Sequence, residues 1–188
     1  AGGHGWCCAR GLAQAAVRAV PQQRAGAHMT ALLDELKVRA RLALNAARRE
    51  AAGASGIQLR HCLNQAARDV GFAHWEHARA VLGGLAARED DMGTFWHAPR
   101  TGILLNLWFA SYEQARAALE ADPAAFLLPY RRQFMVVQAH FIEELGVDAR
   151  HPAWDDISHD LVAAYGGDAW LLLAGQRLRA PRSSFVSS

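Results

Sequence analysis

The sequence has few of the residues and runs that mark specialised classes of protein. It contains only three cysteines, Cys7, Cys8 and Cys62, and neighbours such as the first two bridge only with strain. No disulfide framework is therefore indicated, and a reducing, cytoplasmic setting is expected. The longest apolar runs, such as GILLNLW and AWLLLAG, fall far short of the ~20 residues that a membrane-spanning helix requires. A soluble protein is predicted.

The sequence also lacks the short motifs of common catalytic and cofactor-binding centres. It contains no nucleophile elbow, no phosphate-binding loop and no paired Cys-x2-Cys motif, so no cofactor is expected. Its formal net charge is +2, and segment 29–86 has eight basic and five acidic residues. This charge is far below the concentrated basic patch of a dedicated phosphate binder. Nucleic acid is therefore not an expected partner.

Residues 1–28 differ in composition from the rest of the chain. They are rich in alanine, glycine and arginine, contain no acidic residue and are followed directly by Met29. We interpret them as a leader or disordered extension that makes few contacts with the core. An organellar transit peptide is the alternative, because such peptides form acid-free, arginine-bearing helices. Residues 181–188 are interpreted as a tail.

Residues 29–84 predict three helices with a shared core. The first is expected to begin at Thr30, a good N-cap residue, and its apolar positions recur at helical spacing until Gly53. The second ends at Gly71, which can adopt the left-handed conformation of a helix C-cap. The third ends at Gly83. Each helix alone would be marginal in water, so packing between them must stabilise the module.

The second and third helices carry a spaced pattern, Leu63-x3-Ala67-Arg68-x2-Gly71-Phe72-x2-Trp75, after a basic amphipathic helix that begins LKVRARLAL. The pattern resembles the glyoxalase-related helical domain, a small module appended to some glyoxalase-type proteins and found in other bacterial proteins. The resemblance covers residues 33–85 only. It implies a helical fold and carries over no catalytic residue. Further along, LPYRRQF is similar to a strand of uncharacterised bacterial domains.

The corner between the second and third helices offers four candidate ligand-binding residues, Arg68, His74, Trp75 and His77. The two histidines share a helical face, but two ligands do not make a metal site, and no metal is expected. A weak helix-turn-helix DNA binder is a further alternative, with the third helix in the major groove. The main interpretation is structural, with Trp75 buried in the corner and Arg68 exposed.

Residues 92–180 predict a small α+β domain with the element order β-α-β-α-α-α, after an acidic, glycine-containing linker. The run TGILLNLWFA is expected to form a strand buried on both faces, and FLLPYRRQFMVV a second strand. Ser111 is placed to cap the helix between them. The predicted fold class is therefore α+β and predominantly helical, with a three-helix module followed by this small domain.

Five polar residues of the second half are candidate catalytic residues, provided that they converge on one pocket. They are Asn106, Arg131, His140, Asp156 and His159. Asn106 lies inside an apolar run and needs a hydrogen-bond partner if it is buried, which Arg131 or Tyr130 could supply. Asp156 and Asp160 are four residues apart on one helical face, with His159 beside them. This arrangement suits acid–base chemistry or a hard metal ion, although it also fits a solvated helix face. A small metal-dependent or acid–base enzyme is the second interpretation.

The leading prediction is a non-enzymatic binding or regulatory protein, because no catalytic constellation stands out. A homodimer is also predicted, since two strands are too few for an independently stable sheet. The strand that carries Trp108 is the expected contact, because an exposed apolar edge invites pairing with another chain. The alternative is that the helices after Val137 cover this edge within one chain.

Overall fold

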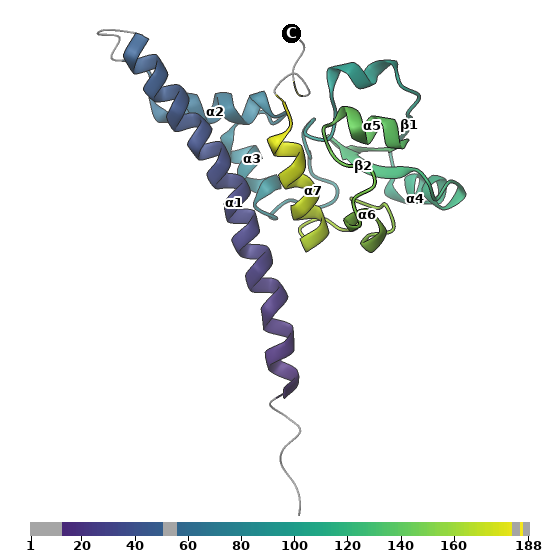
Figure 1. The fold of residues 1–188 in the computed structure, drawn as a ribbon. Helices are drawn as coiled ribbons and strands as arrows, with labels where there is room; N and C mark the ends of the chain where they lie inside the picture. Colours follow the sequence, from purple (N-terminus) through teal and green to yellow (C-terminus); the bar gives the residue numbers. More distant parts are fainter. Residues whose placement is uncertain (1–12, 51–55, 182–184, 186–188) are drawn as a thin grey trace, which may run out of the picture.

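The computed structural model describes the backbone of residues 13–50, 56–181 and 185, and their side chains except those of residues 13–29 and of Glu50 (Figure 1). It is an α+β structure dominated by helices, as predicted. The described elements are, in order, α1 (Ala13–Glu50), α2 (Leu59–Asp69), α3 (Trp75–Leu82), the 3-10 helix η1 (Pro99–Ile103), β1 (Leu107–Phe109), α4 (Tyr112–Ala121), β2 (Phe126–Tyr130), β3 (Gln133–Val137), α5 (Ala139–Glu144), α6 (Ala153–Asp156) and α7 (Asp168–Arg179). No helix among the described residues combines the length and hydropathy needed to cross a membrane.

Helix α1 begins at Ala13, so the predicted start at Thr30 is wrong. The residues before Thr30 are rich in alanine, glutamine and arginine, which favour helix, so the helix does not need a cap at this position. Figure 1 shows that the first half of α1 extends beyond the rest of the molecule. Residues 1–12 of the predicted leader lie outside the described residues. For residues 13–28 only the backbone is described, so their lack of core contacts stays a prediction.

The corner between α2 and α3 forms as predicted. Gly71 has a φ of 96°, and its N–H donates to the Arg68 carbonyl at 3.0 Å. The N–H of Phe72 donates to the Ala67 carbonyl at 3.0 Å, which is the bonding pattern of a left-handed helix C-cap. Phe72 is buried, but Trp75 is only partly buried, so that part of the prediction is wrong. Trp75 is the first residue of α3, and at this rim position the core covers only part of the indole.

The sheet has three antiparallel strands in the order β1-β3-β2. The predicted second strand is in fact a hairpin, because Arg131 and Arg132 form a two-residue turn between β2 and β3. Arg131 has a φ of 50°, a conformation that tight hairpin turns require. Its carbonyl accepts from the Met92 N–H at 2.9 Å and its N–H donates to the Gly93 carbonyl at 2.7 Å. These contacts with the neighbouring loop stabilise a turn that the residue types did not indicate.

The predicted first strand is also shorter than expected. Residues 99–103 form η1 and only residues 107–109 are a strand. Its apolar side chains are not buried on both faces, since Ile103 is 93% and Leu105 87% exposed. Ile103 and Leu105 precede the strand and belong to none of the hydrophobic clusters of the described residues. An apolar run alone therefore does not predict that its side chains are buried.

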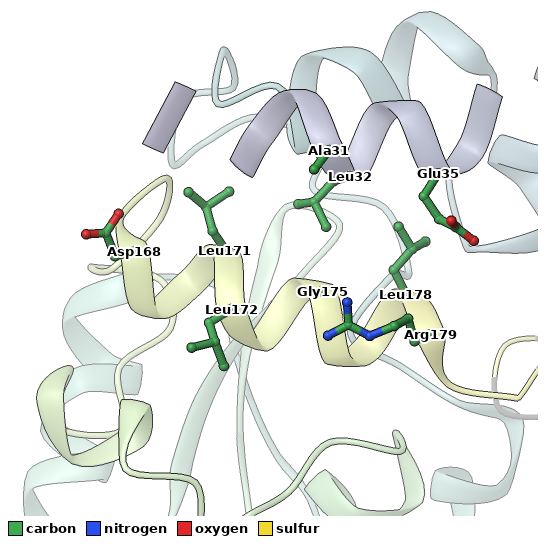
Figure 2. A pocket seen from close by; sticks show the side chains of 9 residues that line it. All are labelled: Ala31, Leu32, Glu35, Asp168, Leu171, Leu172, Gly175, Leu178 and Arg179. Carbon is green, nitrogen blue, oxygen red and sulfur yellow. The ribbon is translucent and has the colours of Figure 1, made fainter. Parts of the chain in front are cut away.

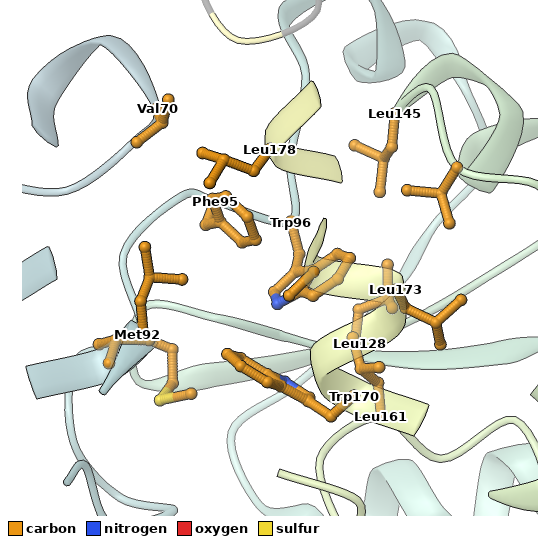
Figure 3. Packing of buried hydrophobic residues seen from close by; sticks show 14 of the residues in the cluster. Val70, Met92, Phe95, Trp96, Leu128, Leu145, Leu161, Trp170, Leu173 and Leu178 are labelled. Carbon is orange, nitrogen blue, oxygen red and sulfur yellow. The ribbon is translucent and has the colours of Figure 1, made fainter. Parts of the chain in front are cut away.

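Residues from both predicted domains share one core cluster. Figure 3 shows Val70, from the three-helix segment, near Phe95, Trp96 and Leu178 of the second half. Helix α7 lies between α1 and the sheet and brings the two halves together (Figure 1). Met92, at the start of the predicted second domain, is buried in the same cluster. The division into two domains stays a prediction. The largest described core cluster contains residues of both and does not divide between them.

Arg177 of α7 is a charged side chain within this core, with no exposed area. Its guanidinium donates to three backbone carbonyls: from Nε to Phe95 at 2.8 Å, from Nη1 to Leu145 at 2.7 Å and from Nη2 to His97 at 2.9 Å. Burial lowers the pKa of Arg177 to about 9, so the group stays protonated at neutral pH. The three carbonyls come from two distant segments, and Arg177 joins both segments to α7.

We expect His97 to make the stability of the protein depend on pH. Burial and the nearby Arg177 guanidinium lower the pKa of His97 below its usual value of 6.5. The unfolded chain therefore binds a proton more readily than the folded chain as the pH falls through 6.5. We expect the free energy of unfolding to decrease on acidification from pH 7.5 to 5.5, and to decrease less in a His97→Gln variant.

Urea denaturation at the two pH values measures this difference. His140→Gln is the control, because the His140 side chain is 64% exposed on the surface of α5. An equal pH dependence in the wild type and the His97→Gln variant would show that His97 does not contribute.

Candidate functional site

The five candidate catalytic residues do not come together in the structure. Arg131 lies in the β2–β3 turn, His140 lies on α5 beside Glu143, and Asp156 is exposed at the end of α6. His159 lines a pocket, but the other four candidate catalytic residues do not line it.

Asn106 does not find the expected partners. Its Nδ2 donates to the Thr101 carbonyl at 3.4 Å, not to Tyr130 or Arg131. Its Oδ1 is buried and has no hydrogen-bond partner among the described residues. The expected pairing is wrong because the chain turns into η1 just before β1, which places Thr101 closer.

His159 lines an open pocket of about 420 Å³ beside α4. Its Nδ1 lies 2.9 Å from the Ala125 carbonyl oxygen, which can only accept, so Nδ1 carries the proton. The imidazole stacks on the Phe126 ring with 4.4 Å between centroids, and Nε2 lies 3.8 Å from Asp155 Oδ1. Ser158 and His159 both have positive φ angles, of 51° and 58°. These contacts fix the position of His159.

Asp160 is the buried carboxylate next to this pocket. Its Oδ2 accepts from the Tyr112 hydroxyl at 2.7 Å and from Arg116 Nη1 at 3.0 Å. Its Oδ1 accepts from the backbone N–H groups of Val162 and Ala163. Burial, and next the hydrogen bond to Asp160, raise the pKa of the Tyr112 hydroxyl. Hydrogen bonds to Tyr112 and Asp160 raise the pKa of the Arg116 guanidinium. Asp160 therefore joins α4 to segment 159–163, which is a structural role.

The groove between α1 and α7 has a volume of about 500 Å³ (Figure 2). Leucines of both helices line it, and Leu172 points away from α1. Its charged residues do not converge, because Asp168 lies at one end and Glu35 and Arg179 lie at the other. The Glu35 carboxylate is also bonded to Arg39 at 2.9 Å. This groove offers no set of polar groups for one ligand.

The four candidate residues of the corner have structural contacts. His74 is the N-cap of α3, and its Nδ1 accepts from the His77 N–H at 3.2 Å. His77 accepts from the Ala73 N–H through Nδ1 and lies 2.5 Å from the Asp91 carbonyl through Nε2. Arg68 is exposed, as predicted, and contacts Gln65. Within the described part of the chain no three His, Cys, Asp or Glu residues are grouped to hold a metal ion.

A different feature emerges from the strand pairing. In an antiparallel pair, hydrogen-bonded and non-hydrogen-bonded residue pairs alternate. Pro129 of β2 has no N–H, so its pair with Phe134 is a non-hydrogen-bonded one. Phe134 and Val136 therefore direct their backbone groups away from β2 and toward β1, where they pair with Phe109 and Leu107. Trp108, which lies between those two, must direct its N–H and C=O to the outer side of the sheet.

The opposite edge of the sheet supports this assignment. The same alternation directs the backbone groups of Leu127 outward from β2. There the Leu127 N–H donates to the His159 carbonyl at 2.9 Å, and the Leu127 carbonyl accepts from the Leu161 N–H at 3.1 Å. The β2 edge is thus covered by segment 159–161, which explains why His159 is held in its position. No described residue forms a backbone hydrogen bond with the outer side of Trp108.

Exposed apolar side chains surround this open edge. Ten large apolar side chains are exposed among the described residues, and four of them lie within residues 103–108. We call these four the β1 edge surface: Ile103, Leu105, Leu107 and Trp108. Trp108 is 44% exposed, and its indole packs against the Tyr130 ring with 4.9 Å between centroids. The β1 edge surface is therefore apolar, and it includes and adjoins the open strand.

Sequence reasoning selected Trp108 as a contact but expected the rest of the run to be buried. The missed signal is charge: residues 101–110 contain no charged residue, whereas exposed edge strands usually carry one. No protein-family model, characterised protein or solved structure that was compared with the chain matches it. The resemblance of residues 33–85 to the glyoxalase-related helical domain therefore stays a prediction.

Proposed function

We propose that this protein is a non-enzymatic binding protein that takes up a strand of another polypeptide along β1. The observation that carries the proposal is the open backbone edge at Trp108, bordered by the β1 edge surface. In strand addition, main-chain hydrogen bonds provide affinity and alternate side chains provide specificity. Trp108 supplies one outward donor and one outward acceptor, and the four apolar side chains supply contact area.

The polar residues favour this proposal over an enzyme. His159 and Asp160, the most promising pair for acid–base chemistry, use their described hydrogen bonds to hold segment 159–163 against β2 and α4. The other four candidate catalytic residues lie elsewhere. We propose the cytoplasm as the setting of this function, because Cys62 is a buried free thiol.

A peptide of eight alternating threonine and valine residues, blocked at both ends, tests strand addition directly. We expect it to slow amide hydrogen exchange at Trp108 about tenfold at saturation, because the outward N–H gains an acceptor. The measurement is exchange followed by mass spectrometry, at a protein concentration where light scattering gives the mass of one chain.

The variant Trp108→Pro removes the outward donor and leaves the β1–β3 hydrogen bonds, which Leu107 and Phe109 make. It should abolish peptide binding. Leu172→Lys is the control, because Leu172 is also 44% exposed but lies on α7. Peptide protection elsewhere than residues 105–110, or equal binding by the Trp108→Pro variant, would contradict the proposed function.

A further inference from the structure

We infer that the polypeptide that pairs with β1 is a second copy of this chain, antiparallel to the first and related to it by a twofold axis at Trp108. The inference rests on the proposed function, because it names the occupant of the same edge. It joins two three-stranded sheets into one continuous sheet with two β1 strands at its centre.

The backbone of β1 is complementary to itself in this arrangement. With Trp108 opposite Trp108 of the second copy, each residue donates its outward N–H to the outward carbonyl of the other. Strand β1 extends one residue to each side of Trp108, so this register uses the whole strand. A register centred on Leu107 would place Phe109 opposite Leu105 of the second copy, which lies outside the strand. The position of Trp108 in the strand therefore selects the axis.

The charge of the segment favours a second copy as the partner. Edges that avoid self-pairing carry lysine, proline or inward-pointing charges, and residues 101–110 contain none of these. Like charges across an interface would disfavour association of identical surfaces. Residues 101–110 carry no charge, so this segment adds no such repulsion. A basic or acidic partner would gain no ion pair from this segment. An identical apolar edge is its best match.

The area is sufficient for a weak but specific dimer. Ile103 and Leu105 are almost fully exposed, and Leu107 and Trp108 are about half exposed. Two copies that cover these side chains and the strand backbone remove on the order of 1,000 Å² from water, which is near the lower limit of specific interfaces. The two indoles lie at the centre, where tryptophan contributes most to binding. We therefore expect association in the micromolar range rather than a permanent dimer.

Size-exclusion chromatography with light scattering tests the second copy. At about 100 µM, well above a micromolar dissociation constant, the mass should approach twice the 20.5 kDa of the chain. The Trp108→Pro variant should have the mass of one chain and an unchanged circular dichroism spectrum, and Leu172→Lys should behave as the wild type. A wild type with the mass of one chain at this concentration would overturn the inference. Strand addition of the threonine–valine peptide would then still decide the proposed function separately.

Oxidative cross-linking tests the axis, in a background with Cys7 and Cys8 replaced by serine. Trp108→Cys places the two thiols opposite each other, with Cα atoms ~5.5 Å apart, and should give a disulfide-linked dimer. Leu107→Cys places them on a diagonal ~7–8 Å apart and should cross-link far more slowly. Faster cross-linking at residue 107 would overturn the register. So would a wild-type dimer that neither variant links.

Discussion

Replacement of Arg177 by methionine is expected to lower the free energy of unfolding by about 3–5 kcal/mol, because three buried backbone carbonyls lose their donor at a cost of about 1–3 kcal/mol each. Methionine fills a similar volume, but it cannot donate to the carbonyls of Phe95, Leu145 and His97. These backbone groups are fixed by the surrounding fold and would be buried without partners. For a chain of this length the melting temperature should fall by roughly 10 °C.

Two further variants separate hydrogen bonding from charge. Arg177→Lys keeps the charge but cannot reach three carbonyls in the planar arrangement of the guanidinium, so it should recover only part of the lost stability. Arg179→Met removes an exposed arginine from the same helix and should change stability little. Urea denaturation provides the comparison. A methionine variant as stable as the wild type would show that removing a costly buried charge offsets the lost hydrogen bonds.

Replacement of Gly71 by alanine should lower the free energy of unfolding by roughly 2–4 kcal/mol, with two contributions. The φ of 96° is unfavourable for any residue with a Cβ. A Cβ at this position would also lie 2.7 Å from Thr94 Oγ1 and 2.8 Å from the Phe95 backbone nitrogen. Because Phe95 belongs to the core, the backbone cannot move aside easily.

Gly56→Ala is the matched control for this substitution. Among the described residues no atom outside its chain neighbours lies within 4 Å of a Cβ built on Gly56, and its φ is outside the left-handed region. Its stability should equal that of the wild type or slightly exceed it, because alanine restricts the unfolded chain. Thermal unfolding of both variants measures the contrast. Equal melting temperatures would mean that the α2–α3 corner is free to rearrange.

The helices were predictable because their ends carry local signals. Ser111 caps α4 through a hydrogen bond from the Gln114 N–H, and Gly71 ends α2. These contacts lie within a few residues and need no knowledge of the fold. The start of α1 was predicted wrongly because Thr30 could cap a helix but lies inside one. The helix-favouring residues before Thr30 let α1 continue back to Ala13.

The strands and the site depended on contacts between distant segments. The turn at Arg131 is held by residues 92 and 93, which lie almost forty residues earlier in the chain. The apolar run before β1 lacks a covering layer, and no local pattern distinguishes a covered run from an uncovered one. Asp156 and Asp160 suggested acid–base chemistry with His159 because their spacing suits one helix face. The chain instead bends at Ser158, and His159 supports the β2 edge.

The coverage of only one edge determines how far association through the sheet can proceed. A sheet with two open edges can add copies at both ends and grow into a filament, which is how exposed strands lead to fibres. Here the outward N–H and carbonyl of Leu127, at the opposite edge, are already hydrogen-bonded to the His159 carbonyl and the Leu161 N–H. In the proposed dimer each copy would therefore have one position for a neighbour, and growth would stop after a single addition. Segment 159–161 thus limits the assembly by covering the edge at which a third sheet would have to pair.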